Sequence, residues 1–334
     1  MVSVIIFSKD RPLQLEGYLT SLMFYSGIQE ENIHVLYTSI PGISYEILVE
    51  KYNRINWINE SSYSADLNRL IRESENYIMF GCDDVFFIET MNINYAFEAL
   101  EQDKSIFSFH LRLGLNIENR PQLEQHPKYL KWNWTQTNSM HWNYPWEVSA
   151  AIYRKSDVLS IIDRIDFSLM KSPNYFEDLI VKGIREREIA IQPNLASFYK
   201  GKALTLTVNR VQEDYKNPFD QTDSTSVEDL YNEYLANKFL DWRKFENSLN
   251  TYIHVNSSYF SLTNENPANY KRPTAILAEH EQEANLKLLE MGFSLKWIIF
   301  RNRLTRRLIR LVNLISPSLL LEIRRIRKKI REIR

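Results

Sequence analysis

Cysteine and glycine are scarce in this sequence of 334 residues, which contains one cysteine, Cys82, and eight glycines. A single thiol excludes an intramolecular disulfide, and with it a small secreted fold held together by disulfides. It also excludes zinc clusters built from several thiolates. The sequence contains no Gly-x-Gly-x-x-Gly, Gly-x-x-x-x-Gly-Lys or Gly-x-Ser-x-Gly motif. This argues against dinucleotide-binding enzymes, Walker-type NTPases and α/β-hydrolases.

Long apolar runs are also absent. No stretch reaches the roughly 18 uninterrupted apolar residues that are needed to span a bilayer. The apolar run at 2–7 is too short for a secretory signal and has no basic residues before it. It instead predicts a buried first strand, and we expect a cytoplasmic location.

Charge is distributed unevenly, although the net charge is only −1. Residues 301–334 hold 12 basic and two acidic side chains, whereas residues 1–300 hold 29 basic and 40 acidic ones. Apolar residues recur at helical spacing on both sides of Ser316-Pro317 and basic residues occupy the opposite faces, which predicts two basic amphipathic helices. We expect these helices to bind an anionic membrane at its inner face. Contact with another subunit in a homo-oligomer is the alternative, and we expect no nucleic-acid partner.

Strand-like and helix-like patterns alternate through the first 84 residues. Strands are predicted at 2–7, 33–37, 55–58 and 77–80, with amphipathic helical segments between them. This alternation predicts an α/β fold with a mostly parallel sheet flanked by helices, followed by a helical C-terminal extension.

Two adjacent carboxylates, Asp83 and Asp84, follow the apolar strand predicted at 77–80. In parallel α/β sheets, ligands gather at the carboxyl ends of the strands. Paired carboxylates are costly there unless a cation joins them, and a divalent metal (Mn²⁺ or Mg²⁺) bridging a diphosphate meets that need. A solvated, Asp-rich turn is the alternative interpretation.

Three short patches resemble the GT-A glycosyltransferases, especially the large inverting family 2 group. The first is the strand and Arg-Pro turn at 2–12, with the Ser-Leu pair of the following helix at 21–22. The second is 77–84, which is similar to that group's aspartate signature, although Asp83-Asp84-Val85 replaces the usual Asp-x-Asp. The third is 174–179, similar to the Glu-Asp pair that opens a helix.

The resemblance implies a metal-dependent glycosyltransferase that moves a sugar from a nucleotide-sugar donor to a hydroxyl of a glycan or lipid-linked acceptor. Asp84 resembles the metal-binding aspartate, and Asp83 resembles its partner toward the ribose or the metal. Asp178 resembles the general base of an inverting transfer, with Glu177 as the alternative; carboxylates are favoured at a helix N-terminus. The second strand ends in Tyr37-Thr38-Ser39, without the acidic residue that many relatives present to the nucleobase.

Other residues are predicted to contact the two substrates. Donor-binding candidates lie at the ends of predicted strands: Ser8, Lys9, Asp10, Arg11, Asp83 and Arg112. Four of the seven tryptophans fall between 132 and 146, and an acceptor platform is predicted from Trp142, Tyr144 and Trp146, with core packing as the alternative.

The predicted organisation is a GT-A-like catalytic domain at 1–215, with a nucleotide-sugar-binding half at 1–100 and an acceptor half at 101–215. A helical or irregular region at 216–279 completes the core, and 280–334 is the basic amphipathic tail. Two other functions stay open. A nucleotidyltransferase acting on sugar phosphates usually has a Gly-rich loop after the first strand, and 8–12 contains no glycine. The third possibility is a non-catalytic, membrane-associated scaffold.

Overall fold

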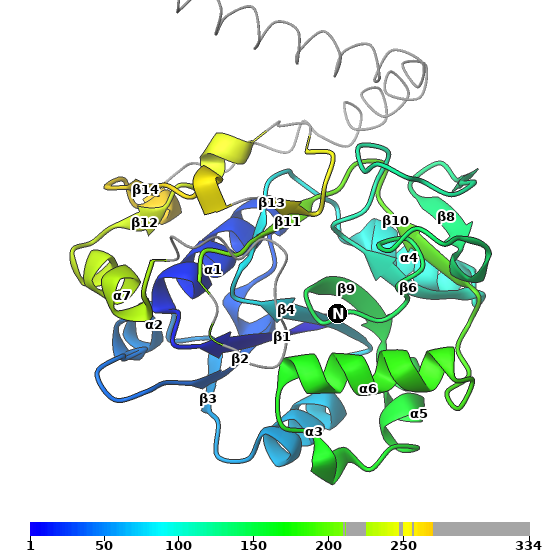
Figure 1. Ribbon diagram of the computed structural model, residues 1–334, viewed down its shortest axis with the longest axis horizontal. Coiled ribbons are helices and arrows are strands. Elements are labelled where there is room, and N and C mark those ends of the chain that lie inside the picture. The colour runs from blue at the N-terminus through cyan, green and yellow to red at the C-terminus, as the bar shows by residue number, and fades with distance from the viewer. Residues whose placement is uncertain (210, 212–224, 247–249, 256, 270–334) are drawn as a thin grey trace, which may run out of the picture. The chain divides into compact units, whose positions relative to one another are not determined.

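A nine-stranded sheet forms the centre of the protein (Figure 1). The computed structural model describes residues 1–209, 211, 225–246, 250–255 and 257–269, all of which belong to one compact unit, Met1–Ala278. Along the sheet the strands are β3 (Asn56–Asn59), β2 (Ile33–Thr38), β1 (Val2–Lys9), β4 (Tyr77–Cys82), β9 (Ala150–Arg154), β6 (Ile106–His110), β10 (Asn194–Ser197), β8 (Leu130–Asn133) and β7 (Glu124–Gln125).

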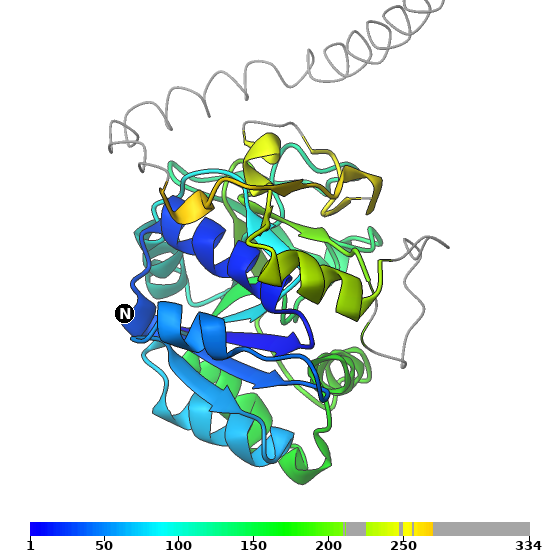
Figure 2. The same cartoon turned by 90° about the vertical axis from the view of Figure 1, so that its left-hand side faces the viewer.

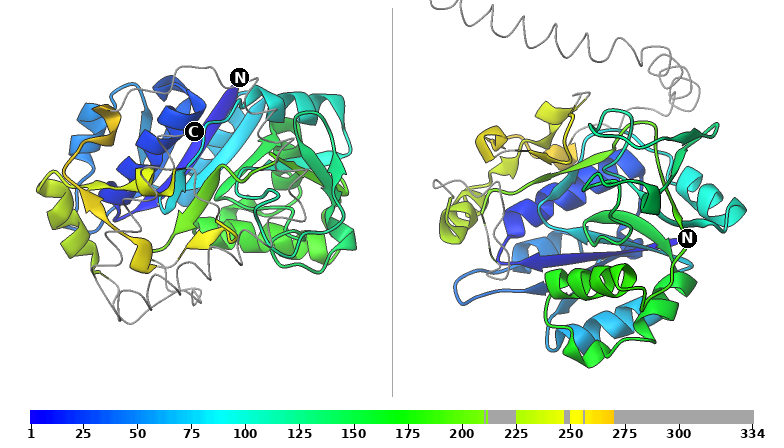
Figure 3. Two further views of the ribbon diagram at one scale, coloured as in Figure 1. Left: turned by 90° about the horizontal axis from the view of Figure 1, so that it is seen from above. Right: turned by 45° about the vertical axis from the view of Figure 1, so that its right-hand side comes forward.

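Most strands of this sheet point in one direction. The first four are parallel neighbours, and β6 and β10 are parallel to each other; β9 is antiparallel to both β4 and β6. Figure 3 shows β1 and β4 side by side at the middle of the molecule. The prediction of an α/β fold with a mostly parallel sheet flanked by helices is confirmed.

The central strands β1, β4, β9 and β6 are buried on both faces because helices cover both faces of the sheet (Figure 2). Along β1, Val4 and Ile6 enter one core cluster, whereas Ile5 and Phe7 enter the other, as the two-residue period of a strand requires. The first cluster includes residues of α1 (Pro12–Ser26), α2 (Glu46–Lys51), α4 (Asn94–Gln102) and α7 (Val227–Leu235). The second includes residues of α3 (Tyr63–Glu73), α5 (Lys155–Ile162) and α6 (Pro173–Arg185).

Helix α1 is buried around most of its circumference. One side lies on the sheet, and the other is covered by α7 and β12 (Phe239–Leu240), which comes from the region predicted to complete the core. Trp242 is fully buried there and donates from Nε1 to Thr20 Oγ1 at 3.1 Å. The helix ends at Gly27, whose left-handed φ of 71° lets its N–H bond to the Met23 carbonyl.

Two small sheets complete the described architecture. One pairs β5 (Val85–Phe87) with β11 (Ala203–Leu206), and β11 with β13 (His254–Val255). The other pairs β12 with β14 (Leu262–Thr263). The first brings chain segments near residues 85, 205 and 254 together beside the exit of β4.

Within the described ranges, no helix has the length and apolar character needed to cross a bilayer. The predicted tail at 280–334, the basic segment 301–334 within it, and residues 216–224 of the preceding region lie outside the described residues.

Candidate active site at the carboxyl edge of the parallel strands

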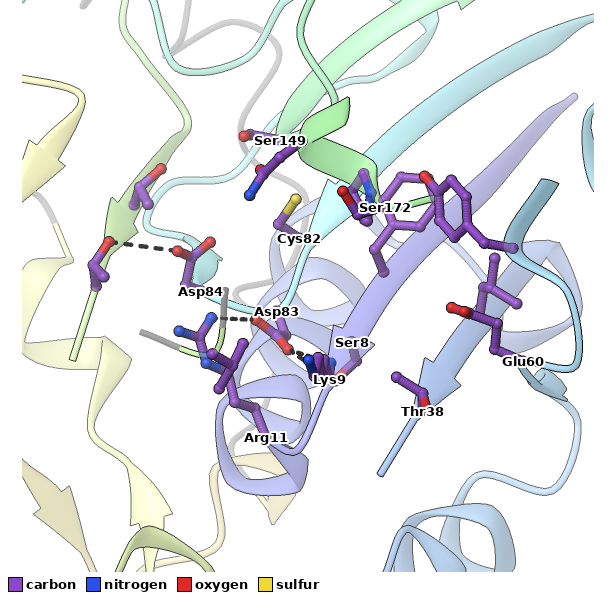
Figure 4. Close-up of a pocket in the computed structure, with 18 of the residues that line it drawn as sticks. Ser8, Lys9, Arg11, Thr38, Glu60, Cys82, Asp83, Asp84, Ser149 and Ser172 are labelled. Carbon is purple, nitrogen blue, oxygen red and sulfur yellow. Dashed lines mark hydrogen bonds and ion pairs between the residues drawn. The ribbon is translucent and has the colours of Figure 1, made fainter. Parts of the chain in front are cut away.

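A cavity of about 550 Å³ lies at the carboxyl ends of β1, β2, β3 and β4 (Figure 4). Because these strands are parallel, their last residues meet at one edge of the sheet. Each strand contributes a lining residue at or just beyond its end: Lys9, Thr38, Glu60 and Cys82. The lining also includes Ser8, Arg11, Asp83 and Asp84, so the structure brings together most of the donor-site and metal-site residues predicted from sequence.

Asp83 is held by a buried network of hydrogen bonds. Arg11 donates from Nη1 to Asp83 Oδ1 at 3.0 Å, in an ion pair whose side chains are 8% and 5% exposed. The other carboxylate oxygen accepts from Ser8 Oγ at 2.9 Å and from the Lys9 backbone N–H at 3.2 Å. Burial raises the pKa of Asp83, while the Arg11 guanidinium opposes that shift. Asp83 therefore joins the turn after β1 to the turn after β4.

The same network fixes the Arg-Pro turn. The Arg11 backbone N–H donates to Tyr45 Oη at 2.9 Å, and Tyr45 Oη lies 2.7 Å from Ser8 Oγ. Arg11 also donates from Nη2 to the backbone carbonyl of Asn209, which lines the cavity. Ser8 and Arg11 thus organise the cavity wall through Asp83, and whether they also touch a donor stays a prediction.

Asp84 differs from its neighbour in being half-buried, with a carboxylate that has almost no protein partners. The one hydrogen bond that this carboxylate makes to the described residues comes from Thr207 Oγ1 at 3.4 Å, whereas the Asp84 backbone carbonyl accepts from the Leu206 N–H at 2.8 Å. A carboxylate that lines a cavity and has spare acceptor capacity suits a hard divalent cation. The described residues contain no group of three or more His, Cys, Asp and Glu side chains placed to hold a metal. A Mg²⁺-type site needs none, because one or two carboxylates, substrate phosphates and waters complete it.

Two predicted donor-binding residues, Asp10 and Arg112, do not line the cavity. Asp10 has a positive φ of 58°, and its carboxylate accepts from the Ile40 backbone N–H at 2.7 Å, so it shapes the loop after β2. Arg112 is buried, pairs with Glu147 and donates to Thr205 Oγ1 at 2.8 Å. Although burial raises the pKa of Glu147, Arg112 and His110 hold it well below its ordinary value. Asp10 and Arg112 therefore hold neighbouring segments in place and do not face the cavity.

The Glu-Asp pair lies in the second turn of α6, which begins at Pro173. Ser172 caps this helix, because its hydroxyl oxygen accepts a hydrogen bond from the Tyr175 N–H. Glu177 turns inward: its carboxylate accepts from Tyr144 Oη at 2.8 Å and from the Val148 N–H at 2.7 Å. Burial raises the pKa of Glu177 to about 7. With both oxygens engaged, Glu177 anchors the segment that carries Ser149, another lining residue.

Asp178 is exposed and does not line the cavity. It is four residues beyond Asn174, which does line it. Residues four apart share a face of a helix, and side chains tilt toward the helix N-terminus, here toward the cavity. Asp178 therefore lies on the solvent side of α6, one helical turn beyond a lining residue, and we call this position the rim of the cavity.

The predicted acceptor platform is wrong for two of its three residues. Trp142 and Trp146 are both 0% exposed. Trp146 packs among Phe80, Tyr153 and Phe176 in the second core cluster, and Trp142 donates from Nε1 to the Glu118 carbonyl at 3.1 Å. Their clustering in sequence reflects core packing. Tyr144 is partly exposed, but its hydroxyl is engaged with Glu177.

Several lining residues were missed in the sequence. Thr38 and Glu60 end two predicted parallel strands, so extending the strand-end argument from 33–37 and 55–58 would have found both. Thr205 is a different case. It is the register partner of His254 across β11 and β13, a pairing that no local pattern signals.

The two aspartates should differ in their effect on stability. We expect Asp83→Asn to lower the free energy of unfolding by about 3 kcal/mol, because it removes one partner of a buried ion pair. Asp84→Asn, the adjacent matched control, should change it by less than about 0.5 kcal/mol. Urea unfolding followed by tryptophan fluorescence measures both. Equal losses for the two variants would contradict the distinction between a structural Asp83 and a ligand-ready Asp84.

Comparison with known proteins gives one curated relative. The chain is 28% identical over 303 residues to the bifunctional glycosyltransferase pgtA of Dictyostelium discoideum, a match that covers 78% of this chain and 39% of the relative. The chain thus matches well under half of the relative's length. No protein-family model matches the chain.

Solved structures give weaker similarities. Residues 1–349 of S. aureus TarS match at a TM-score of 0.40 with 13% identity, over 60% of this chain and 59% of that one. The mannosyltransferase PcManGT from Pyrobaculum calidifontis, in complex with GDP-Man and Mn²⁺, matches at 0.33 with 7% identity, over 55% and 52%. Scores of this size support no inference about ligands. The curated relative is a glycosyltransferase, and it confirms the resemblance to glycosyltransferases that the three sequence patches carry.

Proposed function

We propose that the chain is a glycosyltransferase that moves a sugar from a nucleotide-sugar donor to a hydroxyl of a glycan or lipid-linked acceptor. The observation that carries this proposal is the cavity at the carboxyl ends of four parallel strands, with Asp84 in its lining and Asp83 fixed beside it. Similarity to a bifunctional glycosyltransferase supports the same activity.

In this proposal Asp84 holds a divalent cation, Mn²⁺ or Mg²⁺, against the donor diphosphate. Such an ion supplies Lewis-acid stabilisation of the charge that develops on the leaving nucleoside diphosphate. Lys9 is exposed, lines the cavity and adds positive charge for the donor. The Arg11–Asp83 pair keeps the turns after β1 and β4 at a fixed separation, so that the cavity is preorganised before donor binds.

Asp178 is the general base of this proposal, and the transfer inverts the anomeric configuration. An acceptor approaches from solvent, and its hydroxyl needs a carboxylate that solvent also reaches. Asp178 meets that condition at the cavity rim, whereas Glu177 has both oxygens occupied. Glu177 is then a positioning residue for the wall that carries Ser149.

The cytoplasmic face of a membrane is the location that fits a lipid-linked acceptor. The proposal rests on the sequence of 301–334, with 12 basic residues and helical apolar spacing. A tail bound to anionic lipid would keep the cavity close to such an acceptor.

Donor turnover is the first test. The purified protein should hydrolyse or transfer at least one nucleotide-sugar in the presence of Mn²⁺ or Mg²⁺, and EDTA should abolish that activity. Asp84→Asn should reduce kcat/KM by roughly 10²-fold or more, because the metal would lose its protein carboxylate. Release of nucleoside diphosphate measures all three. A protein that turns over no donor, and instead releases pyrophosphate from a nucleoside triphosphate and a sugar phosphate, would be a nucleotidyltransferase; one that binds no nucleotide would be a scaffold.

The base assignment predicts a split between chemistry and binding. Asp178→Asn should lower kcat by roughly 10²- to 10⁴-fold, while the donor Kd stays within about twofold. Glu186→Gln, at an exposed acid that ends the same helix, serves as the control and should change neither value. Single-turnover transfer and calorimetric donor titration give the two readouts. A parallel loss of donor binding would remove Asp178 from the base role.

The tail assignment predicts lipid dependence. The full chain should co-sediment with vesicles containing anionic phosphatidylglycerol and not with pure phosphatidylcholine, because basic side chains gain from a negative surface. Deleting 301–334 should abolish co-sedimentation. Unchanged sedimentation after the deletion would refute the anchor, and a change in oligomeric state alone would support the subunit-contact alternative.

A further inference from the structure

One wall of the cavity continues outward along α6. In Figure 4, Ser149 and Ser172 lie on one side of the cavity and Arg11 lies on the other. Asn174, in the first turn of α6, lines the cavity, and the residues at 178, 182 and 185 follow it at helical spacing. Residues spaced in this way share one face of a helix. This face therefore carries an exposed acid, Asp178, at the rim and two exposed bases, Lys182 and Arg185, beyond it.

The Arg185 side chain is held by a residue from another segment. Its guanidinium lies over the Tyr144 ring, with Cζ 5.9 Å from the ring centroid. The Tyr144 hydroxyl donates to Glu177 at 2.8 Å, and Glu177 also accepts from the Val148 N–H, next to the lining residue Ser149. Stacking on an aromatic ring orients a guanidinium and leaves its N–H groups available. Arg185 is therefore fixed relative to the cavity wall.

The two bases of this face have no acidic partner among the described residues. Several other exposed bases do pair with acids: Arg54, Arg69, Arg72, Lys104 and Lys128. The last turn of a helix favours basic residues, which accounts for the charge of Lys182 and Arg185. It does not account for a guanidinium held on a ring from a different segment. A guanidinium fixed in this way is suited to bidentate binding of a carboxylate or a phosphate.

We propose that Arg185, with Lys182, binds an anionic group of the acceptor, so that the acceptor is a negatively charged glycan. The inference rests on the proposed function, since it takes the reacting hydroxyl to lie at Asp178. Asp178 and Arg185 are two helical turns apart, a rise of about 10 Å. This distance exceeds the length of one sugar ring. The bound carboxylate or phosphate therefore belongs to a neighbouring residue of the glycan, or to the linkage between residues.

Defined oligomers test this inference. The probes are a galacturonate trimer, which carries carboxylates, a glycerol phosphate trimer, which carries phosphates, and a neutral galactose trimer. The full chain is first saturated with Mn²⁺ and the nucleoside diphosphate that it binds, and each trimer is then titrated by calorimetry. At least one anionic trimer should bind about tenfold or more tightly than the neutral one, and added NaCl should weaken its binding. The trimer that binds more tightly identifies the anion as carboxylate or phosphate.

Variants of the basic face locate the contact. Arg185→Ala should weaken binding of the anionic trimer about tenfold or more, because a bidentate, charge-assisted contact is lost. Arg185→Lys should weaken it by a similar factor, since an ammonium keeps the charge without the planar fork. Lys182→Ala should weaken it by about threefold, as expected for a single point charge. The Kd of the nucleoside diphosphate should stay within about twofold in each variant. Arg164→Ala, at an exposed base outside α6, is the matched control and should change neither affinity.

Other outcomes overturn the inference. Equal affinity for anionic and neutral trimers, no binding of any trimer to the nucleotide-loaded chain, unchanged binding in Arg185→Ala, or an equal loss in Arg185→Ala and Arg164→Ala would each remove Arg185 from acceptor recognition. In those cases turnover of a nucleotide-sugar would still leave the glycosyltransferase proposal standing. If no nucleotide binds and no nucleotide-sugar is turned over, the proposed function itself fails.

Discussion

The buried ion pair between Arg11 and Asp83 is the contact on which the cavity depends. It joins the turn after β1 to the turn after β4, and Arg11 continues to the carbonyl of Asn209, close to 200 residues away in sequence. Two buried charges are tolerated because Ser8 and a backbone N–H satisfy the remaining oxygen of Asp83. The ion pair also gives the two aspartates different roles. Both carboxylate oxygens of Asp83 accept hydrogen bonds from the protein, so of the two aspartates Asp84 is the one with spare acceptor capacity toward the cavity.

A second polar network stands behind the opposite wall. Arg112 pairs with Glu147 and reaches Thr205, and Glu177 holds Tyr144 and the Val148 N–H. These contacts tie the segments around Arg112, Glu147 and Thr205 together at this edge of the sheet. In the first network the buried charges, Arg11 and Asp83, line the cavity themselves. In the second network Arg112, Glu147 and Glu177 do not line it and hold lining residues in place. Both arrangements let a site keep its geometry before a ligand arrives.

The parallel direction of the first four strands of the sheet explains why the cavity is elongated and has two ends. Parallel strands place Thr38 and Glu60 at the same edge as Lys9 and Cys82, so the cavity runs along the sheet from β3 to β4. The small sheet of β5, β11 and β13 then adds Thr205 and His254 beside Asp84. Glu60 lies at one end of the cavity and Asp84 at the other (Figure 4).

The sequence by itself determined the α/β architecture, because apolar runs at 2–7 and 77–80 can only be buried between helices, and it located the acidic turn at 83–84. The ends of the strands predicted at 33–37 and 55–58 also indicate Thr38 and Glu60 as residues of the same edge. Tertiary structure decided which polar residues support the site and which line it. Asp10 and Arg112 became supports, Trp142 and Trp146 entered the core, and Glu177 turned inward while Asp178 stayed at the rim. Residue type and spacing carry no information about these outcomes, because each depends on which partner from a distant segment satisfies a buried charge, hydroxyl or ring.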